Sequence, residues 1–285
     1  MKWYSVLWRG AAMGAADLIP GISGGTIAFI THIYERLIQA VMNFLHLPKQ
    51  LFVQRIGLRA ALKEADAAFL SALLGGIFLS IAALSRVVPW LLEVYPRSMY
   101  ALFIGLIIAA SIAIYRETSK GLRGALWLAL GVLAGVAIAF IPFTQAAPTN
   151  LTFFAVGAVA ISAMLLPGIS GSYLLLIFGQ YQALLVAVQQ PLANAATLIS
   201  FLAGAFVGAA LFSHVIAWTL RKGRKATLAV LTGLMLGALI VPYKELSIAA
   251  SNEPVFVVVL LGVAGVVAVS ALEVVRVRTL RASAD

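Results

Sequence analysis

The chain has 285 residues, of which 62% are hydrophobic and 11% are charged, and its mean hydropathy is +1.04. Soluble globular proteins carry about 25% charged residues, so this composition excludes that class and indicates a polytopic membrane protein. The net charge of +10 does not indicate nucleic-acid binding, because the basic residues occur in short clusters between apolar runs. The absence of cysteine excludes disulfide and thiolate chemistry.

The first predicted element is a broken apolar helical hairpin over residues 5–45. The incoming arm from Ser5 to Ile19 would be about 22 Å long as a helix, which is shorter than the roughly 30 Å hydrocarbon core of a bilayer. We therefore expect a re-entrant hairpin that begins and ends on one side of the membrane. Two full crossings would give the same sidedness, so loop charges do not separate these two alternatives.

A longer polar insert at about 47–66 and three full spans follow this hairpin. The second half of the chain repeats the plan with a hairpin and three spans. We therefore expect an all-α polytopic protein with a single membrane domain over residues 1–285, in which the first repeat covers 1–140 and the second covers 151–276. The second hairpin is predicted at 153–188, and the six spans at 67–85, 99–115, 124–140, 196–218, 227–241 and 255–275.

The two hairpins share a motif. Pro20-Gly21-Ile22-Ser23-Gly24 returns unchanged as Pro167-Gly168-Ile169-Ser170-Gly171, and the alignment from Pro20 to Val41 keeps ten of 22 positions identical. Irregular backbone at bilayer depth survives only where protein or a cavity satisfies its polar groups. A break at the same place in both halves of a membrane protein therefore indicates a transporter's binding site. The similarity continues in the spans, where Ser85, Trp90, Gly105 and Gly131 align with Ser213, Trp218, Gly233 and Gly262.

Clusters of Lys and Arg predict the orientation of each half. The clusters that we interpret as cytoplasmic lie at about 47–66, 116–123, 221–225 and 276–281. The loops at about 144–150, 189–195 and 243–254 carry little net charge and are expected outside. Because each half then has three full crossings, the second half starts on the opposite side, and the two halves form inverted repeats with both termini in the cytoplasm.

At each hairpin tip the residue types favour an anion site. Pro20 and Pro167 end the incoming helices, and Ser23 and Ser170 are suitable N-caps for the outgoing ones. Exposed amides and the positive end of a helix dipole attract an anion. A single such motif would more often be a packing kink, but two copies in inverted halves favour a binding site. The predicted substrate-binding residues at the tips are Ser23, Gly24, Gly25, Thr26, Ser170, Gly171 and Ser172.

Ionisable residues in or near the membrane are concentrated in the first hairpin. Asp17 lies about one helical turn before the tip, where an ionised carboxylate would repel a bound anion. We therefore expect Asp17 to couple transport to protons, with a structural pairing to Arg9 or to the tip amides as the alternative. Arg9 and Arg36 are candidate substrate-binding residues or interfacial anchors, and Glu35 and His214 are further candidates for coupling. No cofactor or metal is expected.

The run from Met13 to Phe29, MGAADLIPGISGGTIAF, resembles the signature of the bacterial polyprenyl-phosphate transporters, formerly a membrane domain of unknown function. The resemblance extends over nearly the whole chain. It implies a flippase in the bacterial cytoplasmic (inner) membrane that returns undecaprenyl phosphate from the outer to the inner leaflet, so that this lipid carrier is recycled in cell-envelope synthesis. The implied partners are undecaprenyl phosphate, membrane lipids and a coupling proton or sodium ion.

Two alternatives belong to other functional classes. Undecaprenyl-diphosphate phosphatases with inverted repeats also place proline- and serine-rich motifs on two hairpins. Their pattern has glutamates before the first tip and an arginine in the second, whereas the second tip here reads Pro167 to Ser172 without arginine. Phosphoryl transfer depends on such cationic groups, so hydrolysis is disfavoured and the protein is not expected to be an enzyme. A transporter of small inorganic anions is the other alternative.

Overall fold

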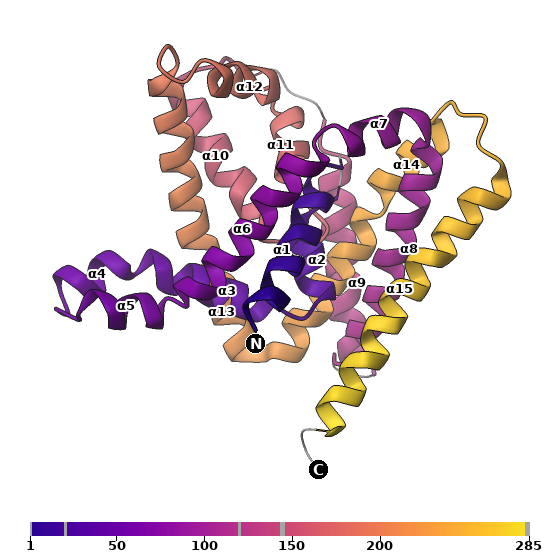
Figure 1. Cartoon of the computed structure of the whole chain (residues 1–285), viewed down its shortest axis with the longest axis horizontal. Coiled ribbons are helices and arrows are strands. Elements are labelled where there is room, and N and C mark those ends of the chain that lie inside the picture. Colours follow the sequence, from indigo (N-terminus) through magenta and orange to yellow (C-terminus); the bar gives the residue numbers. More distant parts are fainter. Residues whose placement is uncertain (1, 20–21, 119–120, 143–145, 283–285) are drawn as a thin grey trace.

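The computed structural model describes residues 2–19, 22–118, 121–142 and 146–282, with side chains omitted for residues 275–282. Every regular element in these residues is a helix, so the predicted all-α class is confirmed (Figure 1). Pro20 and Gly21, and with them the predicted helix-ending role of Pro20, lie outside the described residues.

The first predicted hairpin is built from three helices, α1 (Trp3–Asp17), α2 (Gly24–Ile30) and α3 (Tyr34–Leu45). The second has the same order and similar lengths, in α10 (Asn150–Met164), α11 (Gly171–Ile177) and α12 (Tyr181–Gln189). In Figure 1 the chain starts at the lower end of the molecule and α3 lies there, whereas α12 lies along the upper end. Helices α11 and α12 meet at 112°, a bend that fits a broken span or a re-entrant loop.

The turns inside the two hairpins have matching backbone geometry. His32 and Gly179, at equivalent positions, both adopt positive φ, at 57° and 68°. The next residue of each turn donates a backbone hydrogen bond five residues back, from Ile33 to Ala28 at 3.0 Å and from Gln180 to Leu175 at 2.9 Å. A non-glycine residue rarely adopts this conformation, so His32 is held there by the surrounding turn.

The polar insert forms two short helices, α4 (Leu47–Phe52) and α5 (Leu58–Glu64), which project sideways at the lower end of the molecule (Figure 1). Four helices then complete the first half of the chain. They are α6 (Ala67–Leu84), α7 (Val87–Val94), α8 (Pro96–Tyr115) and α9 (Leu122–Ala139).

The second half ends in α13 (Ala195–Ala238), α14 (Ile240–Ile248) and α15 (Val255–Ala282). The predicted spans 196–218 and 227–241 both lie largely in α13, whose helical geometry is interrupted at Gly223 (φ −162°, ψ 67°). We expected a loop there because of its four charges, but Lys and Arg are good helix formers and only Gly223 leaves the helical conformation. Figure 1 shows that α13 changes direction at this kink.

Five helices of the described chain are long and apolar enough to cross a membrane, or six if the bent pair α11–α12 counts as one span. The five are α6, α8, α9, the continuous stretch Ala195–Ile248 and the part of α15 over Val255–Val274. The six full spans of the sequence prediction therefore appear as five helices, because the kinked α13 contributes two of them.

Small residues set the closest helix contacts. A Cβ atom on Gly76 of α6 would collide with the carbonyl of Leu7 in α1, and one on Gly204 of α13 would collide with that of Phe154 in α10. The same close approach joins α8 to α15 at Gly105 and α9 to α13 at Gly233. Glycine at these positions lets the backbones pack without an intervening side chain, as membrane helices commonly do.

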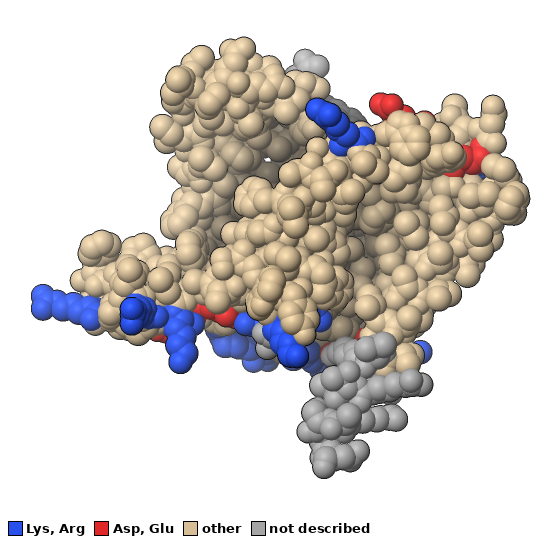
Figure 2. All heavy atoms as spheres, in the orientation of Figure 1, with Lys and Arg blue, Asp and Glu red and all other residues tan. Residues whose placement is uncertain are grey.

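Basic residues are gathered on one edge of the molecule. In Figure 2 Lys and Arg side chains line the lower edge, over α4, α5 and the kinked part of α13, whereas the opposite edge shows a few acidic and basic side chains on a largely uncharged surface. The hairpin tips lie between these edges, where Ile22 of the first tip belongs to the main cluster of buried apolar side chains and Ile169 of the second tip to a smaller one.

Candidate functional site

The first tip folds back on the end of α1. The backbone amide of Gly24 donates to Oδ1 of Asp17 at 2.6 Å, and the amide of Gly25 donates to the hydroxyl of Ser23 at 3.1 Å. Ser23 is therefore the N-cap of α2, as the sequence predicts. A Cβ atom on Gly24 would lie 2.6 Å from Oδ2 of Asp17, so a larger residue here would require this carboxylate to move.

The second tip has related geometry with different chemistry. Met164 occupies the place of Asp17, and a Cβ atom on Gly171 would lie 2.5 Å from its Cγ. Ser170 precedes α11 as its N-cap residue, but within the described residues its side chain makes no capping hydrogen bond. The Ser170 hydroxyl instead hydrogen-bonds to the hydroxyl of Ser172 at 2.7 Å.

The two tips contact each other. The buried hydroxyl of Thr26 accepts a hydrogen bond from the backbone amide of Gly168 at 2.8 Å. Gly168 has φ +94°, a conformation that favours glycine. The Tyr34 hydroxyl donates to the carbonyl of Leu165 at 2.8 Å, so a second hydrogen bond joins the first hairpin to the turn after α10. The structure therefore brings residues 142 positions apart into one polar junction.

A cavity of about 220 Å³ opens beside this junction, and we call it the tip cavity. Its polar lining comes from both hairpins, with Asp17 from the first and Ser170 and Ser172 from the second. Met164, Phe201 and other apolar side chains form the remaining walls. Of the predicted tip residues, Ser170, Gly171 and Ser172 line the cavity directly, whereas Ser23, Gly24, Gly25 and Thr26 are buried and do not belong to its described lining.

The two arginines predicted to bind substrate lie away from the tip cavity. Arg9 donates to the carbonyl of Ser5 at 2.6 Å and stacks on Trp8 at 4.9 Å, about 12 Å along the helix from Asp17 at 1.5 Å per residue. Arg36 forms a two-pronged ion pair with Asp66, at 2.6 and 3.0 Å, which ties α3 to the start of α6.

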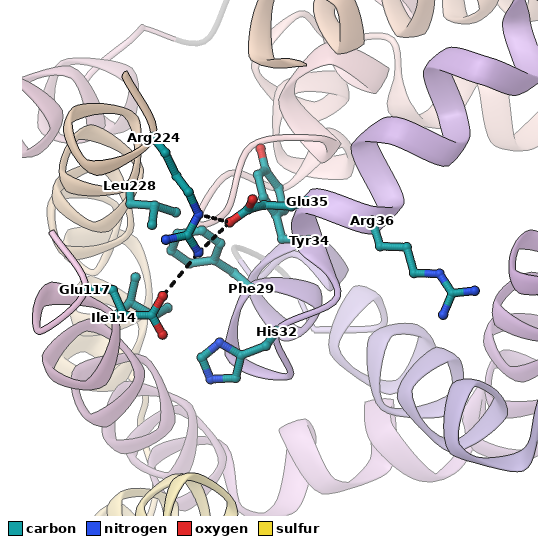
Figure 3. Close-up of a pocket in the computed structure, with 9 residues that line it drawn as sticks. All are labelled: Phe29, His32, Tyr34, Glu35, Arg36, Ile114, Glu117, Arg224 and Leu228. Atoms are coloured by element: carbon teal, nitrogen blue, oxygen red, sulfur yellow. Dashed lines mark hydrogen bonds and ion pairs between the residues drawn. The ribbon is translucent and has the colours of Figure 1, made fainter. Parts of the chain in front are cut away.

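Glu35 belongs to a second, polar cavity of about 310 Å³. Arg224, next to the kink of α13, donates to Glu35 at 2.8 Å and to Glu117 at 3.2 Å (Figure 3). His32, on the same side, contacts Glu273 of α15 at 3.0 Å. Figure 3 shows Arg36 pointing away from this group. These contacts join the first hairpin to α13 and α15 and, through Arg224, to the turn after α8.

His214, the other predicted coupling residue, lies on the first arm of α13 and stacks against His46, with ring centroids 4.7 Å apart. Its Nδ1 lies 2.9 Å from the carbonyl of Ala210. Desolvation by burial, then the nearby charges of His214 and Lys49, lower the pKa of His46 below its usual value. The structure thus places His214 in a histidine pair at the end of α3.

Sequence reasoning missed Glu117 and Arg224 as partners of Glu35. The sequence pattern places Arg224 among several charges of a cytoplasmic loop, and Glu117 lies within the basic segment at 116–123. The available signal in the sequence was the presence of charges of both signs around residues 35, 117 and 224. Their pairing depends on the arrangement of the helices, which brings Glu35 and Arg224 together although they are 189 positions apart.

Several apolar spanning helices and two broken hairpins that meet at a polar junction define a multi-pass membrane protein. A family described as undecaprenyl phosphate translocase-like matches residues 13–256, and the chain belongs to this family. It is 41% identical over 249 residues to a polyprenyl-phosphate transporter of Vibrio cholerae serotype O1, covering 86% of this chain and 80% of that protein. A Staphylococcus aureus protein of the same name is 29% identical over 255 residues, covering 84% and 85%. No solved structure matches the chain.

These matches confirm the family that the Met13–Phe29 run indicated. The relatives are named as transporters and not as enzymes, in agreement with the preference for transport over hydrolysis.

Proposed function

We propose that this protein is a flippase that moves undecaprenyl phosphate from the outer to the inner leaflet of the bacterial cytoplasmic membrane, which recycles the carrier lipid for cell-envelope synthesis. The observation that carries the proposal is the tip cavity, where hydroxyls of the second hairpin face a carboxyl group of the first inside an apolar bundle. Two relatives named polyprenyl-phosphate transporters supply the substrate class.

The tip cavity suits a phosphate monoester. The hydroxyls of Ser170 and Ser172 can each donate one hydrogen bond to a phosphate oxygen, at the cost of the bond that they now share. The amides at the start of α11 add partial positive charge. At the first tip, Asp17 and Ser23 already accept the amides of Gly24 and Gly25, so the second tip provides the donors.

The inverted-repeat arrangement is part of the proposal, and equivalent contacts support it. Gly76 packs on Leu7 as Gly204 packs on Phe154, and each partner in the second pair lies at the aligned position of the first. Such an arrangement would let the two halves exchange conformations around a central site, which is the usual basis of alternating access. With the basic edge in the cytoplasm, both termini lie inside.

Asp17 is the proposed coupling residue. Its carboxyl group lines the same cavity as the two serines, where an ionised carboxylate and a phosphate would repel each other. Protonation of Asp17 on substrate binding removes this repulsion and links transport to the proton gradient. Glu35 and His214 remain secondary candidates for coupling, and Arg9 and Arg36 remain candidates for guiding the phosphate at the cytoplasmic side.

Reconstitution of the purified chain in liposomes with labelled undecaprenyl phosphate tests the proposal. Leaflet exchange and release of inorganic phosphate are measured in the same samples. We expect exchange without release. Phosphate release would support a membrane phosphatase, and exchange of inorganic phosphate without lipid movement would support a small-anion transporter.

A further inference from the structure

A third cavity, of about 460 Å³, lies between the two arms of α13, and we call it the α13 groove. The arms are residues 195–222 and 224–238, on either side of the kink at Gly223. Trp127 of α9 contributes to the lining, and so does Leu166 from the turn after α10. Cavities of this size hold ligands or segments of them.

The α13 groove is lined mainly by apolar side chains. Thr227, Val230, Leu231 and Leu234 line it from the second arm, and their spacing places them on one helix face. The Thr227 hydroxyl donates to the carbonyl of Gly223 at 3.1 Å, so this threonine can present its methyl group to the groove. A hydrocarbon chain fits such a lining, whereas a polar ligand would find few partners there.

The described lining of the groove contains one charged residue. Lys222 provides this charge, with its Nζ 4.9 Å from the ring centroid of Trp218. Leu166 and Leu234 also line the groove, and Leu166 lies two residues beyond Met164 of the tip cavity. A molecule that matches this lining has one anionic head and one long apolar chain.

We propose that the α13 groove is a docking port for a polyprenyl phosphate on the basic edge of the protein, with the polyprenyl chain between the arms of α13 and the phosphate at Lys222. This inference rests on the proposed function, and it adds a second binding site for the same lipid outside the tip cavity. The described lining of the groove has a single cation, Lys222, and the groove is a single cavity. These features match a phosphate lipid with one chain better than a phospholipid with two acyl chains.

The test uses the full chain in liposomes of phosphatidylethanolamine and phosphatidylglycerol, with a polyprenyl phosphate that carries a photoreactive diazirine on its chain. We expect the label to attach to residues 216–234 and to be displaced by excess undecaprenyl phosphate, but not by added phosphatidylglycerol. Equal displacement by phosphatidylglycerol, or labelling spread over all lipid-facing helices, would overturn the port.

A matched pair of variants gives the functional readout. Val230→Trp fills the groove, whereas Val259→Trp adds the same bulk on the exposed face of α15. Filling the groove should slow leaflet exchange about tenfold or more, since it removes the space for the chain, and the control should exchange at the wild-type rate. Equal rates in the two variants contradict the port. Capture of the label by a wild-type protein that shows no exchange would instead overturn the proposed function and retain the port.

Discussion

At the scale of single residues, the proposed coupling role falls on Asp17. Its carboxyl group accepts the Gly24 amide at 2.6 Å and also lines the tip cavity, so one side chain contacts both the backbone of the first tip and the proposed phosphate site. Its predicted partner Arg9 instead bonds to Ser5, about two turns away along α1. The structural partner that the structure shows for Asp17 is thus a tip amide, and coupling through Asp17 stays a proposal.

Asp17→Asn tests this role. The amide imitates the protonated acid and can still accept the Gly24 amide, so we expect binding of the phosphate lipid to persist. Exchange should lose its dependence on pH and on an imposed proton gradient. Measurement of exchange between pH 5.5 and 8 checks the expectation, with Glu35→Gln as the comparison. An unchanged pH profile in Asp17→Asn would make the residue structural.

At the scale of elements, the contact between the two tips depends on Thr26. Thr26→Val removes the acceptor of the Gly168 amide and leaves a buried donor unpaired, which typically costs about 1–3 kcal/mol. We expect lower thermal stability and slower exchange. Thr31→Val is the matched control, because the Thr31 hydroxyl bonds only to the carbonyl of Ile27 in its own turn among the contacts described. Equal effects of both variants would mean that the junction contributes little.

A second element-scale contact fixes the start of α8. Glu253, in the loop before α15, accepts the amides of Arg97 and Ser98 at 2.8 and 2.9 Å. Desolvation by burial raises the pKa of Glu253, but hydrogen bonds from Ser98, Ser251 and Arg97 outweigh it and hold the pKa below its usual value. Because the folded pKa is depressed, this stabilisation is present above the unfolded value of about 4.3 and is lost as pH falls through the folded one.

Glu253→Gln should therefore lower stability by about 1 kcal/mol at neutral pH, since it removes the negative charge from the start of α8. The difference from wild type should shrink as pH falls below about 4.3. Thermal unfolding in detergent at several pH values measures this, with the exposed Glu93→Gln as control. A difference that is constant with pH would exclude the ionised cap.

At the scale of the whole molecule, the sequence predicted the hairpin tips and their capping residues better than the side-chain contacts between helices. The repeated Pro-Gly-Ile-Ser-Gly motif located both tips, and Ser23 is an N-cap as expected, because local propensities decide such features. The pairing of Arg224 with Glu35 and Glu117 was not predictable, since it depends on where α13 bends. The charges around this bend predict a loop, and this prediction is wrong. In the structure Gly223 alone leaves the helical conformation within α13.

The proposed inverted topology has a direct test on this cysteine-free chain. Single cysteines at Asn150 and Gln190 should react with membrane-impermeant thiol reagents from outside, and cysteines at Arg123 and Lys225 only from the cytoplasmic side. Inside-only labelling of Gln190→Cys would contradict the inverted repeats.

The most direct test of the tip cavity as the transport site is leaflet exchange of labelled undecaprenyl phosphate by the double variant Ser170→Ala/Ser172→Ala. This variant removes both hydroxyls from the cavity and introduces no bulk. Ser213→Ala is the matched control, because among the contacts described that hydroxyl bonds to the carbonyl of Ala210 in its own helix. We predict that exchange falls by about tenfold or more in the double variant, as expected from the loss of two hydrogen bonds to a charged ligand, and stays at the wild-type rate in the control. Wild-type exchange by the double variant, at equal protein levels in the liposomes, would contradict the assignment.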